Sequence, residues 1–166
     1  MKAVQIVKPN DLRIIDMDKP TIDAKNNVLV KIKAAGICGS DVGIYHGTNA
    51  AATYPRVIGH ELAGVVVSIP ENNKNGIKVG DRVVVDPYLY CGHCSPCPTG
   101  RTHCFDDLHV LCVHVEGGIA YYSCHSADML VKLPDGLSWL QAAMAEPLTI
   151  RPHGTPRGGL KPGAYC

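Results

Sequence analysis

Three cysteines spaced two residues apart, Cys91, Cys94 and Cys97, form the densest group of potential metal ligands in the sequence. Thiols at this spacing can turn toward one point and hold a soft cation such as Zn²⁺. The same run also occurs in iron–sulfur proteins, but the cysteine expected three residues after Cys97 is missing here. The spacing therefore favours zinc.

A second group of potential ligands is spread along the chain and mixes thiol, imidazole and carboxylate chemistry. Two glycines beside Cys38 let the backbone bend around its thiol, His60 and Glu61 are adjacent, and Glu146 follows an apolar stretch. Taken singly, these residues are also typical of a buried free thiol and a hydrogen-bonded His–Glu pair. A mixed site with an open position beside a closed thiolate site indicates a zinc enzyme.

Composition restricts the classes of protein to which the chain can belong. Its 166 residues suffice for one domain, and 46% apolar and 19% charged residues are typical of a soluble globular protein. The formal net charge of +1 disfavours nucleic acid and acidic membranes as partners. No apolar run approaches the ~18 residues of a membrane span, and the amino terminus does not fit a signal peptide, so we expect a cytoplasmic protein.

Cysteine usage agrees with metal binding. Intracellular reductants keep thiols free, so eight cysteines in a cytoplasmic chain favour metal sites over disulfides. The isolated Cys112, Cys124 and Cys166 are more typical of small apolar side chains in the core.

Glycine, proline and β-branched residues predict a mainly β fold. The chain has 17 glycines, 12 prolines and one phenylalanine. Two short helices are expected, one starting near Ser40 or Asp41 and one over residues 138–145, and residues 88–118 form a long loop that needs an anchor. After Pro147 the helical pattern decays. Strands are predicted at residues 2–7, 12–16, 28–35, 61–69, 82–85 and 129–133.

Five motifs in order resemble the zinc-containing medium-chain alcohol and polyol dehydrogenases, in the branch of sorbitol, threonine and sugar-acid dehydrogenases. The resemblance covers roughly residues 1–150. The motifs are Gly36-Ile37-Cys38-Gly39-Ser40-Asp41, Gly59-His60-Glu61-Leu62-Ala63-Gly64, Val79-Gly80-Asp81-Arg82-Val83, the run of Cys91, Cys94 and Cys97, and Ala145-Glu146-Pro147-Leu148.

The resemblance implies a GroES-like barrel with a metal-binding loop lobe, and zinc-assisted oxidation of a secondary alcohol to a ketone. Its catalytic zinc would be held by Cys38, His60 and either Glu61 or Glu146. Ser40 would pass the substrate proton outward, and Asp41 would accept a hydrogen bond from the His60 ring. The substrate would be a small alcohol or polyol.

Three positions depart from the family pattern. The fourth cysteine of the structural zinc falls at Phe105, one residue after Cys104, so Cys104 or His103 replaces it or the structural zinc is lost. Gly43 stands where the proton path often has a histidine. Cys112 stands where family members more often have glycine.

The chain ends before the family's dinucleotide-binding segment would begin. No Gly-x-Gly-x-x-Gly turn follows a strand, so we expect residues 1–150 to form the zinc-binding domain and residues 151–166 to lead toward an absent Rossmann domain. NAD or NADP is expected only in a full-length enzyme, and this chain alone is expected to be inactive. A non-catalytic zinc-binding or interaction module of the same fold is the alternative, and a homo-oligomer is possible.

Overall fold

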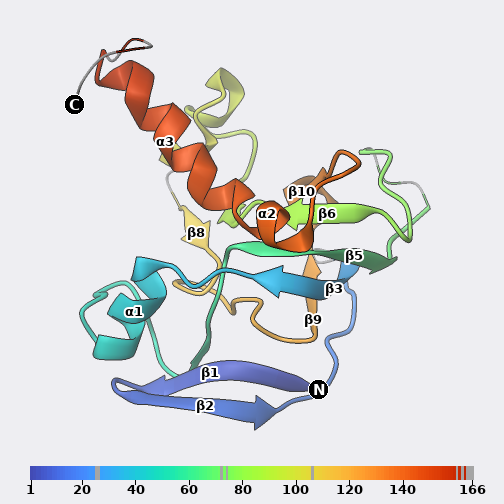
Figure 1. The fold of residues 1–166 in the computed structure, drawn as a ribbon, viewed down its shortest axis with the longest axis vertical. Coiled ribbons are helices and arrows are strands. Elements are labelled where there is room, and N and C mark those ends of the chain that lie inside the picture. The colour runs from blue at the N-terminus through green and yellow to red at the C-terminus, as the bar shows by residue number, and fades with distance from the viewer. Residues whose placement is uncertain are drawn as a thin grey trace.

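The mainly β prediction is confirmed. The computed structural model describes residues 1–24, 27–71, 73, 75–105, 107–159, 161 and 163. Most of its elements are strands in antiparallel pairs, and its helices are few and mostly short (Figure 1). None of the described helices is both long and apolar enough to cross a bilayer.

A five-stranded antiparallel sheet forms the centre of the molecule, with the strand order β10-β6-β5-β3-β9. Alternation of buried valine, leucine and isoleucine with exposed residues turns one face of these strands into the largest hydrophobic cluster, which includes Val30, Leu62 and Val83. The strands are β3 (Val28–Ala35), β5 (Leu62–Ser68), β6 (Arg82–Val85), β9 (Tyr122–His125) and β10 (Leu130–Lys132).

A smaller sheet lies beneath the first, with the order β2-β1-β4 (Figure 1). β1 (Lys2–Lys8) pairs with β2 (Asp11–Asp16) across a tight turn at Asn10, and with β4 (Arg56–Val57). Helix α1 (Gly39–His46) packs its buried Ile44 against Ile6 of β1 and Ile58 in a second hydrophobic cluster. The loop from β3 into α1 therefore lies between the two sheets.

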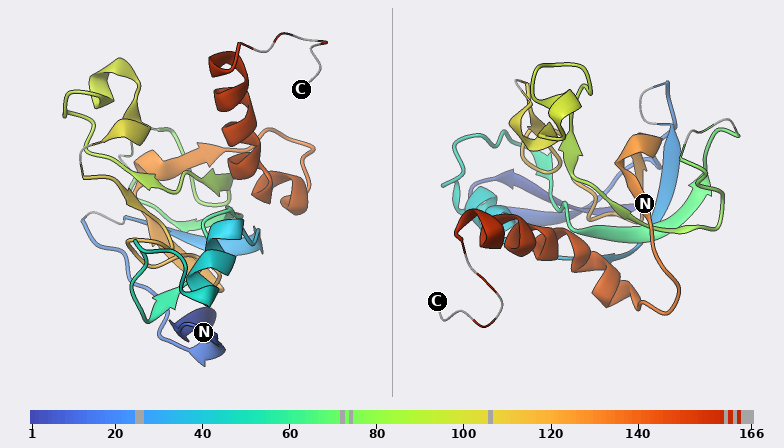
Figure 2. Two further views of the ribbon diagram at one scale, coloured as in Figure 1. Left: turned by 90° about the vertical axis from the view of Figure 1, so that its left-hand side faces the viewer. Right: turned by 90° about the horizontal axis from the view of Figure 1, so that it is seen from above.

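The loop lobe and the carboxyl-terminal helices project to the same side of the five-stranded sheet (Figure 2). The lobe contains a small pair of antiparallel strands. Three short 3₁₀ helices also occur in this half of the chain. Helix α2 is capped by Ser138, whose Oγ accepts from the Gln141 N–H at 3.2 Å. These elements are β7 (Tyr88–Leu89), η1 (Cys97–Thr99), η2 (Thr102–Cys104), β8 (His109–Val110), η3 (Ala127–Met129), α2 (Trp139–Ala143) and α3 (Ala145–Arg157).

The carboxyl-terminal helix differs from the prediction. The helix expected over residues 138–145 is interrupted at Met144, and α3 continues to Arg157 instead of decaying after Pro147. Pro147 lies in the first turn, where no intrahelical acceptor exists for its missing N–H, whereas Pro152 lies in the interior of α3, where a proline is unfavourable but does not end this helix. The prediction from the proline-rich sequence therefore made the helical region too short.

Candidate metal centre

The structure brings together three of the ligands that the sequence predicted, Cys38, His60 and Glu61. One ligating atom of each lies within 4.8 Å of the others. Cys38 caps α1 directly after β3, and the other two residues enter β5, the antiparallel neighbour of β3. The Gly36 N–H donates to the Glu61 carbonyl at 2.8 Å, which continues the pairing up to the site. Strand pairing therefore joins residues more than 20 positions apart.

The Glu61 carboxylate is the strongest indication that this group is built for a cation. Its residue is 6% exposed, and no described side chain forms an ion pair or hydrogen bond with it. The carboxylate occupies the space beside Gly36, where an added Cβ would lie 1.8 Å from Glu61 Oε2. A carboxylate carried by a mostly buried residue is favoured by a nearby positive charge, and a divalent cation would supply one. Thiolate, imidazole and carboxylate are the ligands that zinc takes in catalytic sites.

Asp41 lies close to His60, but another side chain takes the hydrogen-bonding position that we expected it to occupy. Its Oδ1 lies 4.0 Å from His60 Nδ1, whereas the Sγ of Cys112 lies 3.0 Å from the same nitrogen. Asp41 instead accepts from the N–H groups of Cys38 at 2.9 Å and Gly59 at 3.2 Å. It therefore ties the start of α1 to the turn that carries His60.

Cys112 belongs to a second buried group with Asp41 and His60, again within 4.8 Å of one another. Burial raises the pKa of the Cys112 thiol, and the neighbouring Asp41 carboxylate raises it further. Sequence reasoning placed this cysteine in the core and missed its contact with the site. The only signal was a cysteine where the family more often has glycine.

Glu146 lies at the start of α3 and is not part of the group of three ligands. It lines a pocket of about 560 Å³ between α3, the lobe and the edge of the five-stranded sheet, together with Asp86 and Tyr88. Burial raises the pKa of Glu146, and the nearby Glu61 and Asp86 add to this while His60 opposes it. Burial likewise raises the pKa of Asp86 and of Tyr88. The pocket therefore has a largely apolar lining that includes two acidic side chains, Glu146 and Asp86.

Ser40 is half-buried in the first turn of α1, two residues after Cys38. It lies on a short helix whose first turn is tied to Cys38 by Asp41. Gly43 follows one turn later, so α1 offers no second titratable side chain at that position.

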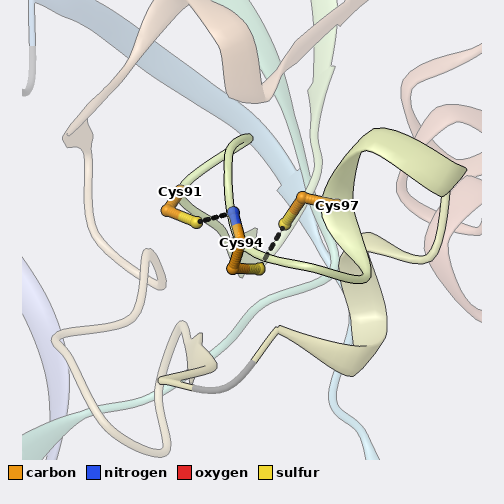
Figure 3. A group of neighbouring side chains, drawn as sticks. All are labelled: Cys91, Cys94 and Cys97. Atoms are coloured by element: carbon orange, nitrogen blue, oxygen red, sulfur yellow. Dashed lines mark hydrogen bonds between the residues drawn. The ribbon is translucent and has the colours of Figure 1, made fainter.

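The thiols of Cys91, Cys94 and Cys97 meet in the lobe, as their spacing predicts (Figure 3). Cys91 Sγ accepts from the N–H of Cys94 at 3.2 Å and of His93 at 3.4 Å, and Cys94 Sγ lies 3.2 Å from Cys97 Sγ. Burial raises the pKa of Cys91, but these N–H groups and the neighbouring thiols outweigh it and lower the pKa to about 7. Burial and the neighbouring thiols raise the pKa of Cys97 to about 11.

Neither candidate for a fourth lobe ligand joins the three thiols among the described residues. Cys104 is exposed at the end of η2 and lies outside the group. The ring of His103 packs edge to face against His153 of α3, with ring centroids 4.8 Å apart. The lobe thus presents three thiols, and His103 links it to α3 instead.

Comparison with known proteins agrees with this geometry. Residues 24–135 match the alcohol dehydrogenase GroES-like domain. The chain is 44% identical over 165 residues to a zinc-type alcohol dehydrogenase-like protein of Haemophilus influenzae, covering 99% of this chain and 48% of that protein. It is 34% identical to sorbitol dehydrogenase of Bacillus subtilis, over 99% of this chain and 47% of the enzyme. The chain therefore spans about half the length of these relatives.

Solved structures of related enzymes have the same architecture. An alcohol dehydrogenase of Escherichia coli CFT073 in complex with NADH superposes with a TM-score of 0.86 at 45% identity, over 96% of this chain and 46% of that one. Galactitol-1-phosphate dehydrogenase of Escherichia coli gives a TM-score of 0.88 at 27% identity, with the same coverage of both chains. The motifs, the barrel and these matches together show that the chain belongs to the zinc-type alcohol dehydrogenase family and carries its GroES-like domain.

Proposed function

We propose that this chain is the zinc-binding catalytic domain of an NAD(P)-dependent dehydrogenase that oxidises a secondary alcohol, such as a polyol or sugar acid, to a ketone. The observation that carries the proposal is the meeting of Cys38, His60 and Glu61, whose ligating atoms lie within 4.8 Å of one another, with His60 and Glu61 each only 6% exposed. These three side chains would hold the zinc ion. When bound, zinc acts as a Lewis acid that makes a substrate hydroxyl easier to deprotonate.

The chain's own residues would orient the substrate and move its proton. The pocket beside α3 would give a polyol a largely apolar wall and hydrogen-bonding groups from Tyr88 and Glu146. Ser40 would accept the hydroxyl proton while its own hydroxyl proton passes to solvent, since a hydroxyl is both a donor and an acceptor. The charges of Glu61 and His60 act on the pKa of Glu146, which places Glu146 near both, so we propose that it can exchange with Glu61 as a ligand.

The cofactor would be bound by a separate half of the enzyme. Relatives are about twice the length of this chain, and one of them has been solved with NADH. Apolar side chains of α2 and α3 are exposed and offer a surface for such a half or for a second copy. They are Leu140, Met144, Leu148 and Ile150, with exposed fractions of 77%, 50%, 54% and 55%. We propose that the isolated chain binds zinc without completing hydride transfer.

A second function is favoured by one observation in the lobe. Cys104 stands apart from the three clustered thiols, so the lobe lacks a fourth thiol ligand among the described residues. A closed structural zinc site takes four ligands. The alternative is a non-catalytic zinc-binding module that keeps the barrel. Because ligating thiols must stay reduced, we propose that either form works in the cytoplasm.

Counting zinc per chain tests the proposal. We call Cys38, His60 and Glu61 the barrel group, and Cys91, Cys94 and Cys97 the lobe group. Elemental analysis of the wild type, Cys38→Ala and Cys94→Ala distinguishes zinc bound at these two groups, because each variant removes a thiol from one group only. Loss of one zinc in Cys38→Ala supports the catalytic site, and a zinc content unaffected by that change contradicts it. A chimera with the cofactor-binding half of a related dehydrogenase then distinguishes the enzyme from the non-catalytic module by its zinc-dependent alcohol oxidation.

A further inference from the structure

The hydrogen-bond partner of His60 is a thiol in this protein. Cys112 Sγ lies 3.0 Å from His60 Nδ1, and the residue is fully buried, with no exposed surface. The contact bridges 52 positions of sequence. A sulfur atom at this distance from a ring nitrogen is a direct hydrogen-bonding neighbour and leaves no room for another group between them.

Asp41 does not hold the ring in the same way, because its nearer oxygen lies beyond hydrogen-bond distance of His60 Nδ1 while both of its oxygens accept from backbone N–H groups. Oδ2 accepts from the Cys38 N–H at 2.9 Å and Oδ1 accepts from the Gly59 N–H at 3.2 Å. The distance of 4.0 Å between Asp41 Oδ1 and His60 Nδ1 is beyond a hydrogen bond. The negative charge still favours a proton on the nitrogen that faces it.

The backbone conformation at Cys112 is a second, independent indication that this residue has a functional role. Its φ of 63° lies in the left-handed region that favours glycine. Residues other than glycine persist in this region where the surroundings hold them, often at functional sites. The loop therefore accepts an unfavourable conformation that directs a thiol at the imidazole.

We propose that Cys112 is a positioning residue for the metal group, which accepts a hydrogen bond from His60 Nδ1–H and thereby leaves Nε2 free as the ligating atom. Which nitrogen of a ligating histidine binds the metal is set by the hydrogen bond that the other nitrogen makes. The proposal deepens the proposed function, because the ring it orients belongs to the same site as Cys38 and Glu61. The opposite assignment, with the thiol donating to Nδ1, would place the ring proton on Nε2 and block ligation.

Nitrogen-15 NMR of the histidine ring in the metal-free chain tests the contact without depending on zinc or on activity. We expect His60 in the Nδ1–H form in the wild type and a changed Nδ1 shift in Cys112→Ala. Cys112→Ser, which restores an acceptor, should keep the Nδ1–H form, and Cys124→Ala is the matched control because it removes a thiol from β9. A wild-type ring protonated on Nε2, or an Nδ1 shift that is the same in Cys112→Ala, would overturn the proposal.

Zinc titration then connects the contact to the metal site. Loss of an outer partner of a ligating histidine lowers metal affinity about 10–100-fold, so Cys112→Ala should weaken zinc binding at the barrel group by this factor. Cys112→Ser should recover most of the affinity, which a role in packing alone would not predict. Equal affinities in the wild type and Cys112→Ala contradict the proposal. If Cys38→Ala has the same zinc content as the wild type, the proposed function is contradicted instead, and the NMR result alone then decides the ring assignment.

Discussion

The two thiol-containing groups of this protein are built in different ways. Cys91, Cys94 and Cys97 are neighbours in sequence, lie in a loop lobe, and are arranged largely by local N–H···S contacts (Figure 3). Cys38, His60 and Glu61 lie just beyond the ends of two paired strands of the central sheet, Cys38 after β3 and the other two before β5. His60 and Glu61 are each 6% exposed. The first group depends on local chain geometry, and the second depends on the intact barrel.

The two groups therefore differ in how much of the folded domain they need to bring their ligands together. A group formed within seven residues can bring its ligands together without the rest of the domain. The barrel group has to bury a carboxylate and an imidazole, which is tolerable only when the surrounding sheet places a cation or hydrogen-bonding groups beside them. We therefore expect the two groups to respond differently to mutation, acid and thiol reagents.

The largest expected effect follows from removing a barrel ligand. His60→Ala should lower the zinc affinity of the barrel group by more than about a hundredfold, because a lost ligand costs more than a lost outer partner. Zinc binding in the lobe should not change. Competition with a coloured chelator measures both sites, with Cys94→Ala as the reciprocal variant. Simultaneous loss of both sites in either variant would show that they are not independent.

Acid should destabilise the barrel through His125. This residue of β9 is 2% exposed, neither ring nitrogen has a hydrogen-bond partner among the described residues, and burial lowers the pKa from 6.5 to about 4. Between these values the unfolded chain binds a proton that the folded chain does not, so stability is lost as pH falls. The loss approaches about 3 kcal/mol at pH 4.

Urea unfolding followed by fluorescence of Trp139, the single tryptophan, measures this effect between pH 7 and pH 4. His125→Leu should flatten the pH dependence by most of this amount, since an apolar side chain removes the titrating group. The exposed His46 provides the control in His46→Gln, which should follow the wild type. An unchanged pH profile in His125→Leu would exclude this histidine as the cause.

A smaller effect is expected from filling the space beside Glu61. A Cβ at residue 36 would lie 1.8 Å from Glu61 Oε2, so Gly36→Ala should displace the carboxylate and weaken zinc binding at the barrel group by about tenfold or more. Gly39→Ala is the matched control, because an added Cβ there meets nothing within 4 Å. Zinc titration of the two variants gives the comparison, and equal affinities would contradict the role of Glu61.

The smallest predicted difference concerns thiol reactivity in the metal-free chain. At pH 7 about half of Cys91 should be thiolate, against about 3% for an ordinary thiol, so iodoacetamide should label it about tenfold faster. Cys112, which is fully buried, should react only on unfolding. Mass spectrometry of timed digests measures both rates. Labelling of Cys112 before Cys91 would reverse the expected contrast between the lobe and the barrel.

The sequence located six strands closely, but it missed β9 of the central sheet and the two-residue strands β4, β7 and β8, and it predicted the carboxyl-terminal helix poorly. Period-two alternation and turn residues located strands such as 28–35 and 82–85, because each depends on local pattern and on one buried face. The extent of α3 was missed, because proline content outweighs the helical pattern in sequence reasoning. Its docking beside the lobe, through His103 and His153, is a tertiary contact that no local pattern contains.

For the candidate site, the sequence by itself determined which side chains are available and which of them are local partners. Cys91, Cys94 and Cys97 were predictable as a group because about seven residues of chain can bring them together whatever surrounds them. Motif order identified Cys38, His60 and Glu61 as well, but only strand pairing placed them within 4.8 Å of one another.

The partner of the His60 ring was decided by the tertiary structure alone. Asp41 was the natural choice from its motif, yet its carboxylate is used by two backbone N–H groups, and a thiol 52 positions away in sequence fills the place. Such choices depend on which groups already have hydrogen bonds and on where a loop can reach. Both are properties of the packed molecule, because they are settled by distances that the order of residues does not specify.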